Sequence, residues 1–245
     1  MNQFKLHKVI WTREKIRTLW QYYENISDFH KIKFLGEDFY INLLNYVKKF
    51  IKTKGKLLDI SCGVGTLINI LYKRGYECYA TTLVDESLKM LKEKFASTNI
   101  SFYKAEITNL PFEDNFFDYV FATEILEHLL TDDLILGLKE VKRILKPFGK
   151  FIITTPYKED LQEVICPDCG AVFNPGQHLQ SFNEKNMKEI LENIGLYVEY
   201  CKLVPKIPLS NNFLKDSFKK LLAFIDKRII SFMYGSIFIT VATKK

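Results

Sequence analysis

The chain lacks the features that mark membrane-spanning and disulfide-rich secreted proteins. No stretch approaches about 18 uninterrupted apolar residues, and residues 1–15 are polar and basic without an apolar core. The five cysteines are an odd number and three of them are scattered, which argues against a disulfide framework. We therefore expect a cytoplasmic protein that has neither a transmembrane helix nor a secretory signal.

Most of the chain also lacks an excess of charge of one sign. Residues 201–245 hold nine of the 35 Lys and Arg residues but only two of the 29 Asp and Glu residues, so the preceding part is close to neutral. A near-neutral body argues against a nucleic-acid partner, because phosphate binding needs a basic surface. The basic excess falls largely on a predicted amphipathic helix over residues 211–233. Such a helix packs on its own sheet, closes a pocket over a lipid-like molecule, or makes peripheral contact with an anionic membrane.

Short apolar runs that alternate with helical patterns dominate the rest of the sequence. The strand candidates are residues 56–60, 77–82, 100–104, 118–122, 148–155, 196–204 and 236–242, and the helix candidates are residues 64–73, 86–95, 131–145 and 184–194. This alternation predicts an α/β protein with a parallel sheet and helices on both of its faces. Helical spacing of apolar residues over 11–50 predicts a helical cap in residues 1–50, in front of a sheet domain in residues 51–245.

A glycine-rich turn follows the first predicted strand. Residues 59–65 read D-I-S-C-G-V-G, and a helical pattern begins directly after them. Because Gly63 and Gly65 carry no Cβ, the backbone can turn tightly there and lie close to a ligand. The spacing differs from the G-x-G-x-x-G pattern of dinucleotide-binding turns. The sequence therefore predicts a different nucleotide-like ligand at the carboxyl end of this strand.

Three further segments follow this turn in a fixed order. They read A-E-I-T-N-L-P-F over residues 105–112, F-D-Y-V-F-A-T-E-I-L-E-H over residues 117–128 and L-K-P-F-G-K-F over residues 145–151. Together with the turn, they resemble the class I S-adenosylmethionine-dependent methyltransferases over about residues 50–200. The resemblance implies a Rossmann-like, doubly wound sheet of seven strands, mostly parallel with the last strand antiparallel. It also implies that residues 51–245 are a methyltransferase domain with S-adenosylmethionine as cofactor.

The resemblance assigns cofactor-binding roles to particular residues. They are Asp59, Ser61, Cys62, Gly63, Gly65, Thr82, Glu106, Ile107 and Thr123, with Tyr22 and Tyr23 from the N-terminal helix. Asp59 would hold the ammonium of the methionine end, and Thr123 would line that end. Glu106 would accept from the adenine amine, and the backbone N–H of Ile107 would donate to an adenine ring nitrogen.

Some of these positions depart from the family pattern or have a second interpretation. Ser61 stands where the family usually has glycine, and serine disfavours a positive φ. The family ends its second strand with an acid that binds the ribose, but here Thr82 takes that position. Asp85 would serve instead if the turn is longer, or it caps the next helix. Tyr22 and Tyr23 either cover the cofactor or pack within the helical cap.

An E-x-x-E-H motif offers candidate metal ligands. Glu124, Glu127 and His128 share one face if this segment is α-helical. The motif resembles the metal site of 2′-O-methyltransferases of small-RNA 3′ ends and of catechol O-methyltransferases of ubiquinone synthesis, and His178 matches a further ligand of the RNA enzymes. The resemblance implies Mg²⁺, Mn²⁺ or a softer ion, which would lower the pKa of an acceptor hydroxyl. Without a metal ion, His128 or His178 is a candidate catalytic base.

A second candidate metal site lies in an inserted loop over residues 156–182. Cys166 and Cys169, in C-P-D-C-G, have the spacing at which two thiolates share one tetrahedral zinc ion. The sequence contains no second C-x-x-C, so Cys201, a histidine or a neighbouring chain would have to complete the site. Otherwise the loop is reduced and metal-free.

These observations predict a methyltransferase that acts on a small-molecule acceptor. Oxygen is the expected acceptor atom, on a hydroxylated metabolite, a sugar or a lipid-linked precursor. One alternative is a metal-dependent RNA 2′-O-methyltransferase. Another is a non-catalytic scaffold subunit that binds the cofactor, which Ser61 and the missing ribose acid favour. The sequence leaves the oligomeric state open.

Overall fold

A computed structural model describes residues 5–25, 36–205 and 236–245. The elements in chain order are β1 (His7–Lys8), α1 (Arg13–Asn25), α3 (Glu37–Val47), β2 (Lys56–Ile60), α4 (Thr66–Lys73), β3 (Glu77–Thr82), α5 (Asp85–Lys94), β4 (Ser101–Lys104), β5 (Phe117–Thr123), the 3-10 helix η1 (Leu126–His128), α6 (Thr131–Ile144), β6 (Leu145–Thr155), β7 (Val164–Ile165), β8 (Ala171–Phe173), α7 (Glu184–Asn193), β9 (Leu196–Pro205) and β10 (Ser236–Lys244). The predicted helix over 211–233 lies outside the described residues. No helix in the described ranges has the length and apolar character needed to cross a bilayer.

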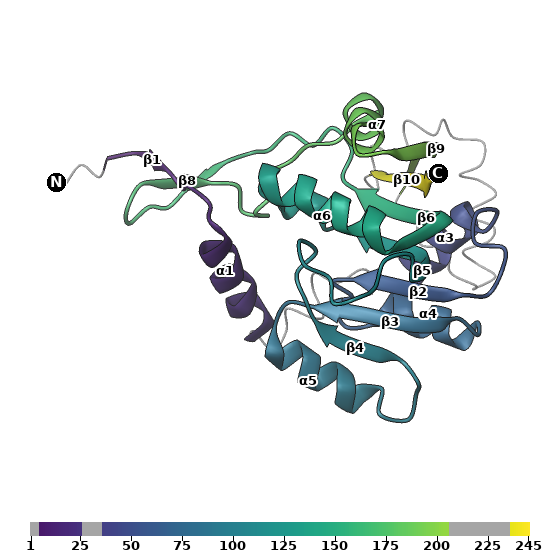
Figure 1. Cartoon of the computed structure of the whole chain (residues 1–245). Helices are drawn as coiled ribbons and strands as arrows, with labels where there is room; N and C mark the ends of the chain where they lie inside the picture. Colours follow the sequence, from purple (N-terminus) through teal and green to yellow (C-terminus); the bar gives the residue numbers. More distant parts are fainter. Residues whose placement is uncertain (1–4, 26–35, 206–235) are drawn as a thin grey trace, which may run out of the picture.

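The main sheet has seven strands in the order β4-β3-β2-β5-β6-β10-β9 (Figure 1). All neighbours pair in parallel except β10, which is antiparallel to both β6 and β9. This topology confirms the predicted α/β, Rossmann-like sheet. The chain runs outward from β2 to β4 and then returns to place β5 beside β2. A crevice for a ligand is expected at the carboxyl ends of the strands at such a reversal.

Two apolar cores lie on opposite faces of the main sheet. Leu57 of β2 belongs to the core that includes residues of α3, α4 and α5, and its neighbour Leu58 belongs to the core that includes residues of α6 and α7. Successive strand residues point to opposite faces, so β2 is buried on both sides. The described part of the chain thus forms three layers, with α4 and α6 on opposite sides of the central strands (Figure 1).

A small second sheet stands apart from the main one. It has the order β1-β8-β7, with β1 parallel to β8 and β7 antiparallel to β8. The predicted loop over residues 156–182 therefore contains a hairpin, and the N-terminal segment adds a strand to that hairpin. Figure 1 shows this sheet projecting away from the main sheet, beyond the start of α1.

The N-terminal region has a break within the residues 11–50 that were predicted to be helical. It contains α1 and α3, and Gly36, directly before α3, is extended with φ −70° and ψ 168°. The periodic apolar pattern continues across this break and does not reveal it. The strand β6 also begins at Leu145, three residues before the predicted start at residue 148.

Candidate functional site

The glycine-rich turn joins β2 to α4 at the carboxyl edge of the main sheet. Ser61, Gly63 and Gly65 have positive φ angles of 54°, 54° and 78°. Ser61 thus adopts the backbone conformation that glycine would take, and its N–H donates to Thr81 Oγ1 at 3.2 Å. A Cβ on Gly65 would lie 2.6 Å from the Phe95 ring, so only glycine fits there. The Ser61 hydrogen bond holds the turn against the end of β3, and Gly65 lies against the end of α5.

Asp59 lies directly before this turn, and its side chain is 1% exposed. Among the described residues, its Oδ1 has no hydrogen-bond partner. Burial raises the pKa of Asp59 to about 8. An ionised carboxylate is costly to bury alone, so a cation bound here would stabilise its charged form.

Tyr40 of α3 lies beside Asp59, and sequence reasoning missed it. Its side chain is hydrogen-bonded to Thr123, at the end of β5, and burial together with the Asp59 charge raises its pKa. In the sequence Tyr40 looks like an ordinary core residue, because it lies on the same buried face of α3 as Leu43 and Leu44. The structure thus brings Asp59, Tyr40 and Thr123 together at the tips of β2 and β5.

The two candidate ribose residues lie in different surroundings. Thr82 is buried and is the last residue of β3. Asp85 is the first residue of α5, and its exposed side chain forms an ion pair with Lys104 of β4. The cap position belongs to Val84, so Asp85 is not the predicted N-cap.

The predicted adenine residues follow β4. Ile107 is buried and packs against α6, where a Cβ on Gly137 would lie 3.0 Å from its side chain. The carboxylate of Glu106 forms an ion pair with Arg17 of α1. Sequence reasoning missed Arg17, which contacts the residue that was expected to bind the adenine amine.

The helix α1 carries the two tyrosines that were predicted either to cover the cofactor or to pack within the helical cap. Tyr22 is 64% exposed, and Tyr23 makes ring contacts with Tyr22 and Trp20, each with centroids 6.0 Å apart. Trp20 is the aromatic residue that reaches inward, since its ring lies 5.0 Å from the ring of His128. The described contacts of Tyr22 and Tyr23 therefore support packing within α1.

Glu127, His128 and His178 form what we call the Glu127 cluster. One ligand atom from each residue lies within 4.8 Å of the other two. Glu127 is 1% exposed, and the two imidazole rings have centroids 4.6 Å apart. Glu124 is not in this cluster. The predicted α-helical face is wrong, because Glu124 has a φ of 54° and the residues after Ile125 form the 3-10 helix η1.

Residues outside the Glu127 cluster contact the Nδ1 atoms of both of its histidines and orient the rings. The Nδ1 atom of His178 is hydrogen-bonded to the carboxylate of Glu159. The Nδ1 atom of His128 lies 3.3 Å from the carbonyl oxygen of Gln177, whose side chain accepts a hydrogen bond from Trp20 at 3.0 Å. Metal-binding and catalytic histidines are typically oriented by such contacts at the second ring nitrogen. Sequence reasoning missed Glu159 and Gln177.

Cys166 and Cys169 lie at the turn between β7 and β8. The N–H of Cys166 donates to the carbonyl of Ala171 at 2.8 Å, and the N–H of Gly170 donates to the carbonyl of Cys166 at 3.0 Å. Backbone N–H groups of Cys169 and Asp168 lower the pKa of the Cys166 thiol. Cys201 lies elsewhere, on β9, where its sulfur is 3.4 Å from Thr240 Oγ1.

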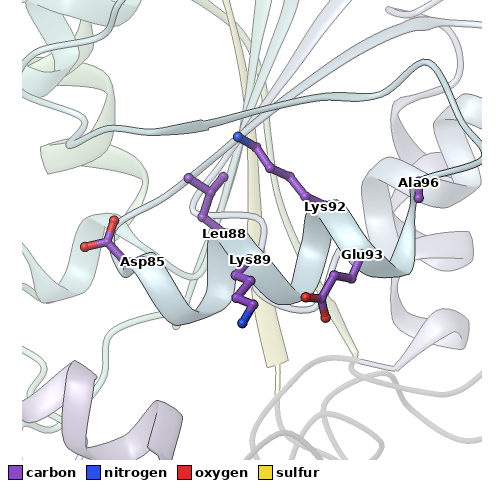
Figure 2. A pocket seen from close by; sticks show the side chains of 6 residues that line it. All are labelled: Asp85, Leu88, Lys89, Lys92, Glu93 and Ala96. Carbon is purple, nitrogen blue, oxygen red and sulfur yellow. The ribbon is translucent and has the colours of Figure 1, made fainter.

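A cavity of about 460 Å³ lies on another part of the surface. Its lining residues are Asp85, Leu88, Lys89, Lys92, Glu93 and Ala96. Figure 2 shows these residues along α5 and just beyond its end. Apart from Asp85 it contains none of the predicted site residues, so we place the candidate site at the sheet edge.

Comparison with known proteins decides the family. Residues 58–153 match the family model described as a methyltransferase domain. An uncharacterized protein of Methanocaldococcus jannaschii is 32% identical over 206 residues, which are 76% of this chain and 86% of that protein. A demethylmenaquinone methyltransferase of Staphylococcus aureus is 39% identical over 101 residues. This chain belongs to the class I S-adenosylmethionine-dependent methyltransferases. The methyltransferase therefore uses S-adenosylmethionine as its methyl donor.

Other similar proteins differ in what their names say they methylate. A sterol 4-C-methyltransferase of Caenorhabditis elegans is 33% identical over 115 residues. Our methyltransferase spans 34% of that enzyme and 41% of the Staphylococcus aureus enzyme. The 1,6-didemethyltoxoflavin-N1-methyltransferase of Burkholderia thailandensis, with S-adenosylhomocysteine bound, has a TM-score of 0.69 at 16% identity, covering 98% of this chain and 93% of that one. This last likeness shows the fold.

Proposed function

We propose that this methyltransferase transfers a methyl group to a hydroxyl oxygen of a small molecule, such as a hydroxylated metabolite, a sugar or a lipid-linked precursor. The observation that carries the proposal is the Glu127 cluster. Its Glu127 and His128 follow β5, at the edge of the sheet where Asp59 and the glycine turn lie, and its His178 comes from the segment after β8. A hydroxyl acceptor must lose a proton, and the cluster offers groups that can take one.

Bound S-adenosylmethionine supplies an electrophilic methyl group and leaves as a neutral thioether. The protein therefore contributes mainly position. The carboxylate of Asp59 would hold the ammonium of the methionine end, beside Tyr40 and Thr123. Glu106 and the N–H of Ile107 would bind the adenine, and Thr82 lies where the ribose is expected. The burial and strand-end positions of Asp59, Thr82, Ile107 and Thr123 support these assignments, and Glu106 follows β4 half-buried and paired with Arg17.

His178 is the candidate base. Its Nδ1 contact with Glu159 sets the ring orientation and would stabilise the imidazolium that forms when the ring takes a proton from the acceptor hydroxyl. The same cluster fits a divalent ion, because one carboxylate and two imidazoles are a suitable donor set and both rings have outer contacts. In that case Glu127, His128 and His178 would hold Mn²⁺ or Mg²⁺, which would lower the pKa of the acceptor hydroxyl.

Methyl transfer to defined acceptors tests this proposal. The full chain would be incubated with methyl-labelled S-adenosylmethionine and catechol, a monosaccharide, a primary amine or a short RNA, with Mn²⁺ or with EDTA. We expect transfer to a hydroxyl of catechol or the sugar, and His178→Ala and Glu159→Gln should slow it by about 100-fold or more. Both variants should keep the affinity for S-adenosylhomocysteine, and Asp160→Asn, next to Glu159 and exposed, should change neither quantity.

Each other outcome has a defined meaning. Transfer to the amine alone, or unchanged rates in both variants, would contradict O-methylation assisted by the Glu127 cluster. Transfer confined to the RNA would favour a 2′-O-methyltransferase. Loss of activity in EDTA, with recovery in Mn²⁺, would assign the cluster to metal binding.

We also propose that Cys166 and Cys169 bind a structural zinc ion. Two thiols in one hairpin turn, one of them with a pKa lowered by backbone N–H groups, are a typical half of a tetrahedral zinc site. Zinc measured by mass spectrometry in the purified protein should fall to background in Cys166→Ser. Equal zinc in the variant and the original protein would contradict this site.

A further inference from the structure

The hairpin that carries the two thiols is part of a projecting unit, which we call the arm. It consists of residues 5–10 and 163–174 and contains β1, β7 and β8. The backbone N–H of Val9 donates to the carbonyl of Val172 at 2.9 Å, and Lys8 pairs with Glu163 at 3.0 Å. These contacts join the two segments, and Figure 1 shows the arm extending away from the main sheet.

The arm holds two zinc ligands where a structural site needs four. Among the described residues, no third His, Cys, Asp or Glu ligand atom lies within 4.8 Å of both thiols. His7 of β1 is near them in the small sheet, since its N–H donates to the carbonyl of Gly170, but its Nδ1 lies 3.2 Å from the carbonyl oxygen of Lys5. Cys62 and Cys78 are buried in the main core, and Cys201 lies against Thr240. The site at Cys166 and Cys169 is therefore incomplete within the described part of one chain.

The arm exposes several large hydrophobic side chains. The described residues include eight large hydrophobic side chains that are exposed, and four of these lie in the arm, a small part of the chain. They are Leu6, Ile10, Val164 and Ile165, which are 60%, 76%, 43% and 47% exposed. The strands β1 and β7 are also the two edges of the small sheet. Exposed apolar groups beside open strand edges are typical of a surface that another protein covers.

We propose that the arm joins two copies of this chain, and that Cys166 and Cys169 of both copies bind one shared zinc ion. A two-fold arrangement brings identical surfaces together, so each copy supplies the two thiolates that the other lacks. The same arrangement would cover the apolar side chains on one face of both arms. Binding releases the thiol protons to solvent and changes no oxidation state. The inference rests on the proposed zinc site and adds its occupant and stoichiometry.

Zinc content and molecular mass, measured together, test the shared site. The full chain, loaded with zinc, should sediment as a dimer with one zinc ion per two chains. Chelation, or the Cys166→Ser substitution, should give a zinc-free monomer, whereas Cys201→Ser should remain a zinc-containing dimer. Ile165→Lys keeps both thiols but places charge in the apolar surface, and should weaken the dimer roughly tenfold or more.

The possible failures are distinct. A monomer with one zinc ion per chain would overturn the shared site and leave the zinc proposal intact. A protein that binds no zinc would overturn both. A dimer that survives chelation and the Cys166→Ser substitution would show that the copies associate without the ion. An unchanged thermal melting temperature in Ile165→Lys would confirm that the main domain, which the arm does not enter, is still folded.

Discussion

Replacing Asp59 by Asn should raise the free energy of unfolding relative to that of the original protein as the pH rises. The same substitution should weaken cofactor binding. Burial raises the pKa of Asp59 from an ordinary 3.8 to about 8. Between these two values the folded protein holds a proton that the unfolded chain has lost. The stabilisation from this proton is complete below the unfolded pKa and declines as the pH approaches the folded pKa, by about 1.4 kcal/mol per pH unit.

Asn does not titrate, so the difference between the two proteins isolates this residue. From about pH 5 to about pH 7, the free energy of unfolding of Asp59→Asn should rise by about 3 kcal/mol relative to the original protein. A buried amide without a partner adds a cost of about 1–3 kcal/mol to the variant, but this cost does not depend on pH. Urea unfolding at several pH values measures the difference.

Parallel pH profiles for the two proteins would refute this reasoning, because they would show that Asp59 titrates equally in the folded and unfolded states. Saturating S-adenosylhomocysteine gives a second check. Its ammonium should favour the ionised carboxylate and remove most of the pH dependence of the original protein.

Two further substitutions test the turn and the adenine site. Gly65→Ala should destabilise the protein by about 1–3 kcal/mol more in urea unfolding than Gly75→Ala, because both glycines have a positive φ but only Gly65 would place its Cβ 2.6 Å from the Phe95 ring. Glu106→Ala should weaken S-adenosylhomocysteine binding by roughly tenfold or more in calorimetry, since it removes a charged acceptor of a hydrogen bond, and Glu113→Ala should not. Equal losses within either pair would contradict the corresponding contact.

The sheet was predictable because its determinants are local. Apolar runs of strand length alternate with helical patterns, and Leu57 and Leu58 enter opposite cores as the strand period requires. The glycine turn was predictable for the same reason, since Asp59, Gly63 and Gly65 are close in sequence and act through backbone geometry.

The remaining site residues meet through the fold, and no sequence spacing encodes their contacts. Tyr40 reaches Thr123 from a helix that precedes the sheet, and Glu159 orients His178 from across the inserted loop. The α-helical spacing rule failed at Glu124 because the chain turns there with a positive φ and continues as a 3-10 helix. The change of backbone conformation at Glu124 depends on where the end of β5 lies in the fold. The periodicity of apolar residues carries no information about that position.

The arm connects the zinc proposal to the site. The helix α1 begins shortly after β1, and it contacts the body through Arg17 on Glu106 and through Trp20 on Gln177. A metal that orders the arm would therefore also restrict the start of α1, the helix that contacts Glu106 and reaches the Glu127 cluster.

Calorimetric titration of the full chain with S-adenosylhomocysteine tests the central claim most directly, because every assignment at the sheet edge assumes that this crevice binds the cofactor. We predict one binding site per chain with a dissociation constant below the millimolar range, and affinity that falls at least tenfold in Asp59→Asn. No binding at millimolar ligand, or equal affinity in both proteins, would contradict the account.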